Sequence, residues 1–298
     1  MLEVETPVLC AAGAVDEHLD PIPAAWHPAG DPARKEPRWL VTSPEHSMKR
    51  LLAAGSGPIY QITRAFRDGE RGRLHNPEFT IIEWYRPGLD HLALMDEVEA
   101  LVRALLAGLL ETGSGPRPFR RTAYRDAFRR AMGLDPFLEP VEGLARAARE
   151  RGLSADAAAG RDSILNILLA VAVEPDLGRD APEFLVDYPP SQAALARVRE
   201  GDPPVAERFE LYIRGLELAN GYHELLDARE QERRFREANV RRREAGKVEL
   251  PIDGRLLRAL EAGLPACAGV AMGFDRIVML ATGARSIDEV LAFPIERA

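Results

Sequence analysis

The most constraining feature of this chain is a pair of strand-like segments joined by a charged connection. Gln61 to Phe66 and Phe79 to Tyr85 are rich in β-branched and aromatic residues, whereas Asp68 to Pro77 contains the Gly, Asn and Pro of a loop. The pattern predicts a β-hairpin that holds Arg67 and Phe79 at the two ends of its loop. A guanidinium there can meet a phosphate while the ring stacks on a base. A solvated hairpin with ordinary surface charges is the competing interpretation.

A second segment places a positive side chain beside small residues. Ala268 to Gly273 consists mostly of small residues and leads through Asp275 and Arg276 into an apolar run with helical spacing. Glycine allows the backbone to approach a ligand closely, and the first turn of a helix attracts anions. The pattern therefore predicts an anion site next to Arg276.

A third segment predicts a second hairpin, which turns at Arg214-Gly215. A two-residue turn places Tyr212 opposite Glu217 and Glu210 opposite Ala219, so that Glu210 and Glu217 are diagonal neighbours on one face. Carboxylates that close repel each other unless a cation lies between them. Mg²⁺ carrying phosphate oxygens is the expected occupant, and a pair of solvent-facing strand carboxylates is the alternative.

Composition limits the class of protein. The chain has 298 residues, 46% apolar and 29% charged, which suits one catalytic domain with a large core. We expect a cytoplasmic protein, because no apolar run is long enough to span a bilayer and no signal peptide is apparent. Cys10 and Cys267 are predicted to be buried packing residues, since two cysteines cannot form a disulfide framework. The net charge of −8 disfavours a nucleic-acid partner, because nucleic-acid binding rests on a basic surface. The lack of a long apolar run disfavours association with a membrane.

The remaining segments predict mainly helices. Asp90 to Leu110 has apolar residues at helical spacing, and residues 119–175 are expected to form a mostly helical insertion. Ala228 to Lys247 is rich in both Arg and Glu, which favours a solvated, salt-bridged helix over a nucleic-acid face. We expect a strand at Phe184 to Tyr188 and a Pro/Gly-rich loop at Pro21 to Pro37.

Several linked motifs carry a family resemblance. They read TSPE at residues 42–45, HNPEFT at 75–80, EWYRP at 83–87 and ELANGYHE at 217–224. Together with the three segments above, they resemble motifs 2 and 3 and the acidic hairpin of class II aminoacyl-tRNA synthetases, in the order of the lysyl branch. They are most similar to stand-alone ligases of that branch, which attach (R)-β-lysine to elongation factor P.

The resemblance implies an α+β class II synthetase-like catalytic domain over residues 1–298, with an antiparallel sheet flanked by helices. Motif 1 is expected to be truncated at residues 1–7, the helical insertion to span about 119–175, and no anticodon-binding domain to be present. A homodimer is implied, although the missing part of motif 1 leaves its stability open. The implied cofactors are ATP, as a substrate, and Mg²⁺.

The resemblance also implies roles at the nucleotide. Arg67 would bridge the substrate carboxylate and the α-phosphate, and Arg276 would neutralise the distal phosphates and cover the adenine opposite Phe79. Glu210 and Glu217 would hold Mg²⁺. The other implied nucleotide contacts are Asp68, Gly69, His75, Asn76, the Leu218 backbone and Gly273.

Acceptors for a diamino acid follow from the same motifs. Glu45 would meet the amino group nearer the carboxylate, and Glu83, Tyr85 and Glu224 would surround the terminal ammonium, because buried acids need a cationic partner. Asn220 would orient the carboxylate of the amino acid. The other residues of the implied pocket are Ser43, Pro44 and Ala271. The alternatives are that Tyr85 is a core aromatic residue and that Glu45 decorates a helix N-terminus.

Two positions depart from the family pattern. Gly69 stands where motif 2 usually has an acid, and Glu70 could replace that acid only if the loop shifts. Ala271 stands where the tRNA-charging enzymes of the lysyl branch usually have glycine, and its methyl group would favour a β-amino acid.

The preferred interpretation is an AMP-forming enzyme that adenylates (R)-β-lysine or lysine and transfers the acyl group to a lysine side chain of elongation factor P. Two alternatives remain. One is a lysyl-tRNA synthetase fragment that charges tRNA, and the other is a catalytically silent regulator that binds lysine or nucleotide.

Overall fold

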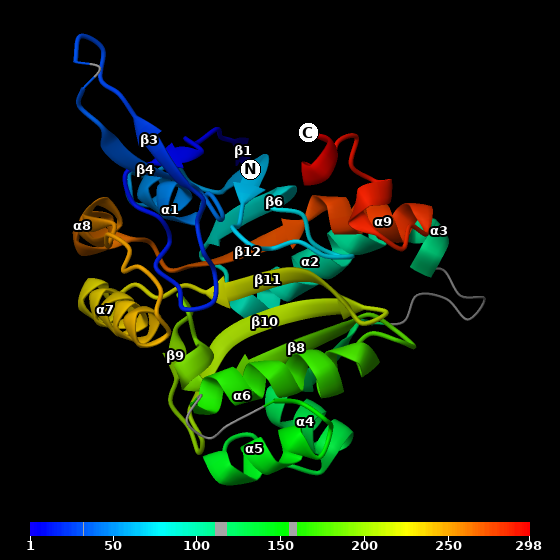
Figure 1. Cartoon of the computed structure of the whole chain (residues 1–298). Helices are drawn as coiled ribbons and strands as arrows, with labels where there is room; N and C mark the ends of the chain where they lie inside the picture. Colours follow the sequence, from blue (N-terminus) through cyan, green and yellow to red (C-terminus); the bar gives the residue numbers. More distant parts are fainter. Residues whose placement is uncertain (32, 111–117, 155–159) are drawn as a thin grey trace. The chain divides into compact units, whose positions relative to one another are not determined.

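A computed structural model describes residues 1–31, 33–110, 118–154 and 160–298. The chain forms two compact units (Figure 1). Unit 1 comprises Met1–Asp90, Ala104–Leu106 and Glu224–Ala298, and unit 2 comprises His91–Arg103 and Ala107–His223.

Unit 1 is built on a sheet in which the predicted motif 2 hairpin occupies the centre. Its strands follow the order β1 (Leu2–Glu3), β5 (Ile59–Phe66), β6 (Glu78–Pro87) and β12 (Cys267–Gly273). β5 and β12 pair antiparallel with β6, while β1 runs parallel to β5. The predicted hairpin is therefore confirmed, and the small residues before Arg276 form the strand next to it.

Unit 1 also contains four helices and a small second sheet among its described residues. The helices are α1 (Glu45–Ala53), α7 (Ala228–Glu244), α8 (Gly254–Gly263) and α9 (Phe274–Thr282), with 3-10 turns at Ile287–Glu289 and Ile295–Arg297. The small sheet places β4 (Glu36–Leu40) between β2 (Leu9–Cys10) and β3 (Pro23–Trp26). The loop predicted at Pro21 to Pro37 is thus wrong in part, because backbone pairing across two strands overrides the Pro-rich composition.

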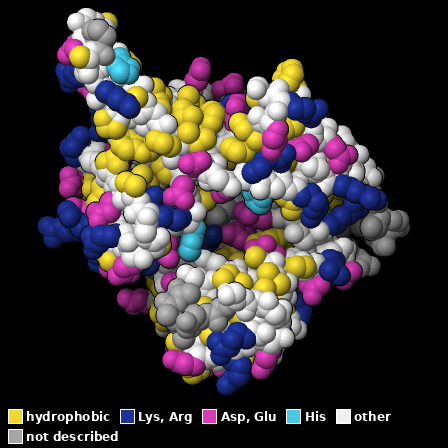
Figure 2. Space-filling view, in the orientation of Figure 1, with side chains coloured by type: hydrophobic (Ala, Val, Ile, Leu, Met, Phe, Trp, Pro, Cys, Tyr) yellow, Lys and Arg dark blue, Asp and Glu magenta, His cyan; other side chains and the backbone are white. Residues whose placement is uncertain are grey.

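Exposed apolar side chains gather over β1, β3 and β4, where Figure 2 shows a yellow area. The exposed apolar residues of the N-terminal segment include Met1, Leu2, Val8, Leu9 and Trp26. Cys10 is half-buried and Cys267 fully buried, so the expectation of two buried cysteines holds for Cys267 alone. Helix α7 carries the predicted ion pairs one turn apart, such as Arg234 with Glu230.

Unit 2 is built on a second set of strands. β10 (Val205–Ile213) pairs antiparallel with β11 (Leu216–His223) and with β8 (Glu183–Tyr188), and β7 (Arg120–Ala123) runs parallel to β8. The short β9 (Val198–Arg199) pairs with β10. The strand predicted at Phe184 to Tyr188 is confirmed.

The insertion is mostly helical, as predicted, although β7 lies within it. Its elements are α4 (Tyr124–Met132), α5 (Val141–Arg149), α6 (Arg161–Leu168), a π-helical turn η2 (Leu169–Val173) and a 3-10 turn η3 (Glu174–Asp176). A further 3-10 turn, η4, spans Pro190–Gln192. The helix predicted from Asp90 is broken into α2 (His91–Leu105) and α3 (Ala107–Leu110). Tyr124, Phe128, Leu165 and Tyr188 belong to the buried core under these helices.

Among the residues that the structure describes, no helix is both long enough and apolar enough to cross a membrane.

Candidate functional site

Helix α1 contributes two residues to a cluster of buried and half-buried polar side chains in unit 1. We call this cluster the acid pocket and define it as Glu45, Lys49, Glu83, Tyr85 and Glu224. Pro44 precedes the helix. The Ser43 hydroxyl accepts the backbone N–H of Glu45 at 3.3 Å. Glu45 is therefore the first helical residue, as the alternative interpretation of this residue proposed, and it also faces the pocket.

Lys49 lies one turn after Glu45 and is buried, with 1% of its surface exposed. Its Nζ lies 2.7 Å from Glu45 Oε1 and 2.5 Å from Glu224 Oε2. The pocket therefore contains an internal ammonium group between two of the predicted substrate-binding carboxylates. Lys49 was not among the residues predicted from the sequence.

The central strand supplies the opposite wall of the acid pocket. Alternation along β6 puts Glu83 and Tyr85 on one face, and the Tyr85 hydroxyl donates to Glu83 Oε1 at 2.7 Å. Both side chains are 2% exposed. The predicted common face is confirmed, and Tyr85 is a buried aromatic residue with a hydrogen-bonded hydroxyl that also contacts a pocket carboxylate.

Register places three further residues on this face. Directly opposite residues in antiparallel strands share a face, and Glu83 lies opposite Gln61 on β5 and Ala271 on β12. Tyr85 lies opposite Gly269. A Cβ at Gly269 would come within 2.3 Å of the Tyr85 ring and 2.5 Å of Glu224 Oε1, so only glycine leaves room for these two side chains.

Several acceptors of the acid pocket have no hydrogen-bond partner. Within the part of the chain that the structure describes, the buried atoms without a hydrogen-bond partner include Glu83 Oε2, Glu224 Oε1 and Gln61 Oε1. Buried polar atoms without partners are costly, and a primary ammonium offers three N–H donors. These atoms are suited to a ligand that carries an ammonium group.

The pocket holds more acid than base. Burial raises the pKa of Glu83 to about 8, with the Glu45 carboxylate adding to the effect. Burial also raises the pKa of Glu224 to about 7, although the Lys49 ammonium opposes the rise. Burial alone would lower the pKa of Lys49, but Glu224 and Glu45 raise it. One ammonium is therefore too little positive charge for three carboxylates.

The predicted nucleotide residues begin further along the same face of β6. Phe79 lies an even number of residues before Glu83, and four residues of strand span about 13 Å. The Arg67 guanidinium carbon lies 5.0 Å from the centre of the Phe79 ring, in cation–π contact. The hairpin thus brings together the arginine and the ring that the sequence predicted at the ends of its loop.

The first turn of α9 reaches the loop of this hairpin. Arg276 Nη2 lies 2.8 Å from His75 Nε2. Burial lowers the pKa of His75 and the Arg276 charge lowers it further, which favours the neutral imidazole. Asp275 accepts the backbone N–H of Thr80 at 2.7 Å, so α9 is tied to β6 beside Gly273, the residue that precedes the helix.

The rest of the loop is held by backbone geometry and by the C-terminal segment. Asn76 donates to the Glu78 carbonyl at 2.6 Å and accepts the N–H of Ile295 at 3.0 Å. Gly69 has a φ of +74°, a conformation that favours glycine over the acid usual in the family. Asp68 donates its backbone N–H to Asp20.

Glu70, the acid that follows Gly69, lies near Arg67 in the hairpin loop. Its Oε2 lies 3.7 Å from Arg67 Nη1.

In unit 2, the second hairpin turns where predicted, with positive φ at both Arg214 and Gly215. Tyr212 lies opposite Glu217, as expected, but Glu210 lies opposite Asn220 rather than Ala219. The cause is a β-bulge, in which β11 carries Leu218 as an extra residue. A bulge leaves backbone groups out of the ladder.

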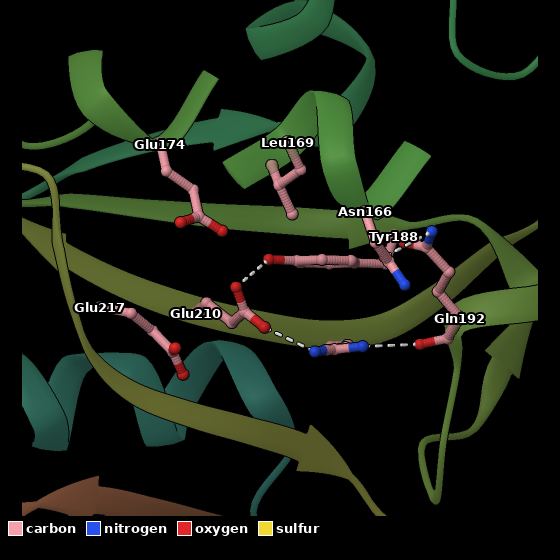
Figure 3. A pocket seen from close by; sticks show the side chains of 8 residues that line it. Asn166, Leu169, Glu174, Tyr188, Gln192, Glu210 and Glu217 are labelled. Carbon is pink, nitrogen blue, oxygen red and sulfur yellow. Dashed lines mark hydrogen bonds and ion pairs between the residues drawn. The ribbon is translucent and has the colours of Figure 1, made fainter. Parts of the chain in front are cut away.

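Glu210 is already satisfied by its neighbours. The hydroxyls of Tyr188 and Tyr212 each donate to its Oε2 at 2.6 Å, and Arg208 donates to Oε1. These four residues, which we call the tyrosine cluster, are shown in part in Figure 3. Glu210 and Glu217 line one pocket, so the predicted shared face is confirmed.

Asn220 of β11 adds a polar atom close to Glu210, its partner in the sheet. Asn220 Oδ1 is buried and has no hydrogen-bond partner in the part of the chain described. The pocket of Figure 3 also contains Glu174, Asn166 and Gln192. Carboxylate oxygens are suited to Mg²⁺, but Glu210 would have to exchange tyrosine hydrogen bonds for a metal bond.

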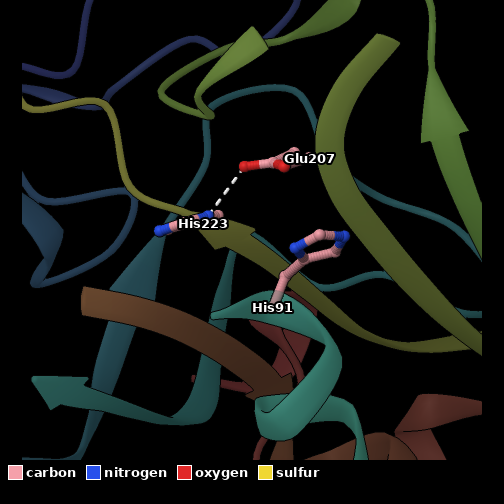
Figure 4. Close-up of side chains that lie close together, drawn as sticks. All are labelled: His91, Glu207 and His223. Carbon is pink, nitrogen blue, oxygen red and sulfur yellow. Dashed lines mark hydrogen bonds and ion pairs between the residues drawn. The ribbon is translucent and has the colours of Figure 1, made fainter. Parts of the chain in front are cut away.

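A separate cluster in unit 2 contains His91, Glu207 and His223 (Figure 4). His223 Nδ1 lies 2.7 Å from Glu207 Oε2. Glu207 also faces Arg197 at 3.6 Å and Arg199 at 3.7 Å. Three positive or hydrogen-bonding partners explain the burial of Glu207, and we interpret the group as an ion-pair cluster.

Sequence reasoning missed Lys49 in the acid pocket, and also Gln61 and Gly269, which lie beside the pocket on the neighbouring strands. The spacing of Glu45 and Lys49 by four residues was the available signal for Lys49, because such pairs meet on a helix. For Gln61 the signal was its position in the alternation of β5. Nothing in the sequence alone distinguished Gly269 from its small neighbours.

Comparison with known proteins agrees with this geometry. Residues 1–297 match the family model of class II tRNA synthetases (D, K and N). The chain is 49% identical over its full length to the elongation factor P--(R)-beta-lysine ligase of Vibrio cholerae, covering 90% of that protein. The proteins of the same name from Klebsiella pneumoniae and Salmonella paratyphi B are 47% and 46% identical, again over the whole chain and 90% of each relative.

Proposed function

The chain belongs to the family of class II tRNA synthetases (D, K and N), and we propose that it is an ATP-dependent ligase that adenylates (R)-β-lysine or lysine and transfers the acyl group to a lysine side chain of elongation factor P. The acid pocket supports this most directly, because Glu83 and Glu224 keep buried oxygens without partners. A carboxylate pocket of this kind requires a cationic ligand.

The amino acid would lie along the central strand. Its terminal ammonium would be bound by Glu83, Tyr85 and Glu224, and the other amino group by Glu45. Asn220, with its unpartnered buried oxygen, would orient the carboxylate. Ser43, Pro44 and Ala271 would shape the pocket.

Activation would require the substrate carboxylate to attack the α-phosphorus in line while pyrophosphate departs. Arg67 would hold the carboxylate and α-phosphate together, and Arg276 would stabilise charge on the distal phosphates, because positioned cations act most strongly where charge develops. Phe79 would stack on the adenine. For this, the guanidinium of Arg67 would leave the ring that it covers.

Mg²⁺ would supply charge neutralisation at the phosphates, with Glu217 as its principal ligand and Glu210 as a secondary one. Glu210 is secondary because two tyrosine hydroxyls and Arg208 already bind its oxygens. The bulge at Leu218 frees backbone groups for the nucleotide. The remaining nucleotide contacts would come from the hairpin loop and the residue before α9, at Asp68, Gly69, His75, Asn76 and Gly273.

The acceptor separates the proposal from its alternatives. The named relatives are elongation factor P ligases over the whole length of this chain, which favours a protein acceptor over tRNA. A silent regulator is disfavoured because Arg67, Glu217 and Arg276 are all present. We place the reaction in the cytoplasm, where elongation factor P acts in translation.

We also propose a homodimer. Met1, Leu2, Val8, Leu9 and Trp26 are exposed apolar residues of the N-terminal segment, and a second copy of the chain would cover them. Sedimentation or light scattering of the chain at micromolar concentration would test this, and a strictly monomeric protein would contradict it.

Pyrophosphate release from ATP tests the enzymatic proposal. A panel of lysine and β-lysine enantiomers should give the fastest release with (R)-β-lysine. Radiolabel from that amino acid should then appear on elongation factor P and not on tRNA. Labelled tRNA without labelled protein would favour the tRNA-charging alternative, whereas no pyrophosphate release with any isomer would favour the silent regulator.

A further inference from the structure

The acid pocket contains a cation that no motif assigns. Lys49 is 1% exposed, and both of its close partners, Glu45 and Glu224, are among the proposed substrate ligands. A buried lysine needs a structural or functional reason, because its long side chain and its charge are costly to bury. Its position inside a binding pocket calls for a functional one.

Charge counting defines that reason. Glu45, Glu83 and Glu224 can carry three negative charges, and Lys49 carries one positive charge. The fully ionised pocket then has a net charge of −2, which equals the charge on the two ammonium groups of a diamino acid. Without Lys49, even a bound diamino acid would leave one buried carboxylate without a counter-ion.

Contacts divide the oxygen atoms of the pocket in the same way. Lys49 occupies Glu45 Oε1 and Glu224 Oε2, while Glu224 Oε1 and Glu83 Oε2 remain without partners. Lys49 therefore determines which oxygens face a ligand. It also links the first turn of α1 to Glu224, the residue that follows β11.

We propose that Lys49 is a positioning residue: a built-in counter-cation that pairs with Glu45 and Glu224, holds both carboxylates in place, and so makes the pocket selective for amino acids with two ammonium groups. This inference rests on the proposed function, in that the pocket is taken to bind lysine-type substrates. Lys49 itself would contact the carboxylates and not the reacting atoms.

The groups that face Lys49 predict a pH signature. They are Glu45, Glu224 and Glu83, with the Tyr85 hydroxyl and the Cys267 thiol nearby. The pKa of Glu224 is about 7 and that of Glu83 about 8, so in the wild type the KM for lysine should fall as these carboxyls ionise between about pH 6 and 9. Loss of Lys49 raises the pKa of Glu224 further, and the fall in KM should move to higher pH.

The test uses the full chain with Lys49→Met, and Arg50→Met as the matched control on the same helix. At pH 7, Lys49→Met should raise the KM for lysine or (R)-β-lysine by at least about tenfold, the loss typical of one hydrogen bond to a charged group. Its kcat and its KM for ATP should change much less. Arg50→Met, which removes a charge outside the pocket, should match the wild type.

A double variant separates positioning from folding. Lys49→Met combined with Glu224→Gln leaves no unpaired charge at that contact, so it should fold even if Lys49→Met does not. If Lys49 acts through its two carboxylate partners, the rise in lysine KM caused by Lys49→Met should be smaller in the Glu224→Gln background than in the wild type, because one of the two contacts is already lost. Additive effects, or an unchanged pH profile in Lys49→Met, would overturn the proposal.

A measurement without substrate distinguishes failure of this inference from failure of the proposed function. Without its counter-ion, Glu224 keeps a folded-state pKa above its unfolded value, and a raised carboxyl pKa makes stability fall as pH rises. The melting temperature of Lys49→Met should therefore drop further below that of the wild type from pH 6 to 9. If no isomer of lysine is activated by the wild type, the proposed function fails. If the difference in melting temperature between the two proteins stays constant from pH 6 to 9, the counter-cation role fails instead.

Discussion

The acid pocket and the tyrosine cluster both bury glutamates, but they satisfy them to opposite degrees. In the tyrosine cluster, Glu210 accepts from two tyrosine hydroxyls and from Arg208. In the acid pocket, Glu83 accepts one tyrosine hydroxyl at Oε1 and keeps Oε2 without a partner. Both oxygens of the Glu210 carboxylate therefore have hydrogen-bond partners, whereas only one oxygen of the Glu83 carboxylate has one.

The difference indicates which carboxylates can bind a cationic ligand without first losing hydrogen bonds. A satisfied carboxylate must break hydrogen bonds before it can bind a cation, whereas an unsatisfied one gains them. The raised pKa of Glu83, about 8, expresses the same deficit, because burial without enough positive charge favours the protonated form. We expect substitutions to have larger effects on amino-acid binding in the acid pocket than on metal binding at Glu210.

The largest effect should come from the two arginines that we propose bind the substrate phosphates. Arg67→Ala and Arg276→Ala should each slow adenylate formation by about 2.7 to 4 kcal/mol, roughly 100- to 1,000-fold, because each removes a positioned cation from developing negative charge. Pyrophosphate release measures the loss, and circular dichroism confirms folding. Near-normal release by either folded variant would remove that arginine from the proposed mechanism.

A direct comparison of the two regions pairs Glu83→Gln with Glu210→Gln. Glu83→Gln should raise the KM for lysine by about 1.5 to 3 kcal/mol, roughly 10- to 150-fold, because it removes a charged acceptor of the terminal ammonium. Glu210→Gln should leave that KM close to the wild-type value. Steady-state kinetics with saturating ATP decides the matter, and equal effects of the two substitutions would break the comparison.

The strands and turns that form both regions could be predicted from the sequence. Alternation along β6 placed Glu83 and Tyr85 on one face, and the Arg214-Gly215 turn set the start of the second hairpin. These features follow from local backbone rules with a short period. They depend little on what packs around them.

Features that depend on tertiary packing were missed or wrong. The bulge at Leu218 shifted the partner of Glu210 by one residue, and no residue in that strand signals a bulge by its chemistry alone. Lys49 was not predicted to be a pocket residue, because it pairs with a residue distant in sequence, Glu224. The sequence therefore predicted which acids line the pocket, but not how they are neutralised.

Magnesium dependence should sharpen the comparison within unit 2. Glu217→Gln should raise the Mg²⁺ concentration needed for half-maximal activity by roughly tenfold or more, on the scale seen when metal sites lose supporting groups. Glu210→Gln should have a smaller effect, because its oxygens are shared with Tyr188, Tyr212 and Arg208. Titration of both variants with Mg²⁺ measures the difference. Unchanged titrations in both would return this hairpin to the interpretation of ordinary strand carboxylates.

The smallest expected effect concerns the shape of the acid pocket rather than its charge. Ala271 is half-buried and lies opposite Glu83 in the sheet, so its methyl group borders the same face. Ala271→Gly should improve the use of α-lysine relative to (R)-β-lysine by about 1 kcal/mol, roughly fivefold, because one methyl group in a pocket changes discrimination at this scale. The ratio of kcat/KM for the two amino acids measures the change. Ala268→Gly is the control for backbone flexibility, because Ala268 is buried and lies three residues earlier on the same strand, on the opposite face. An equal change in both variants would show that loosening of β12, and not the methyl group beside Glu83, controls the choice between the two lysine isomers.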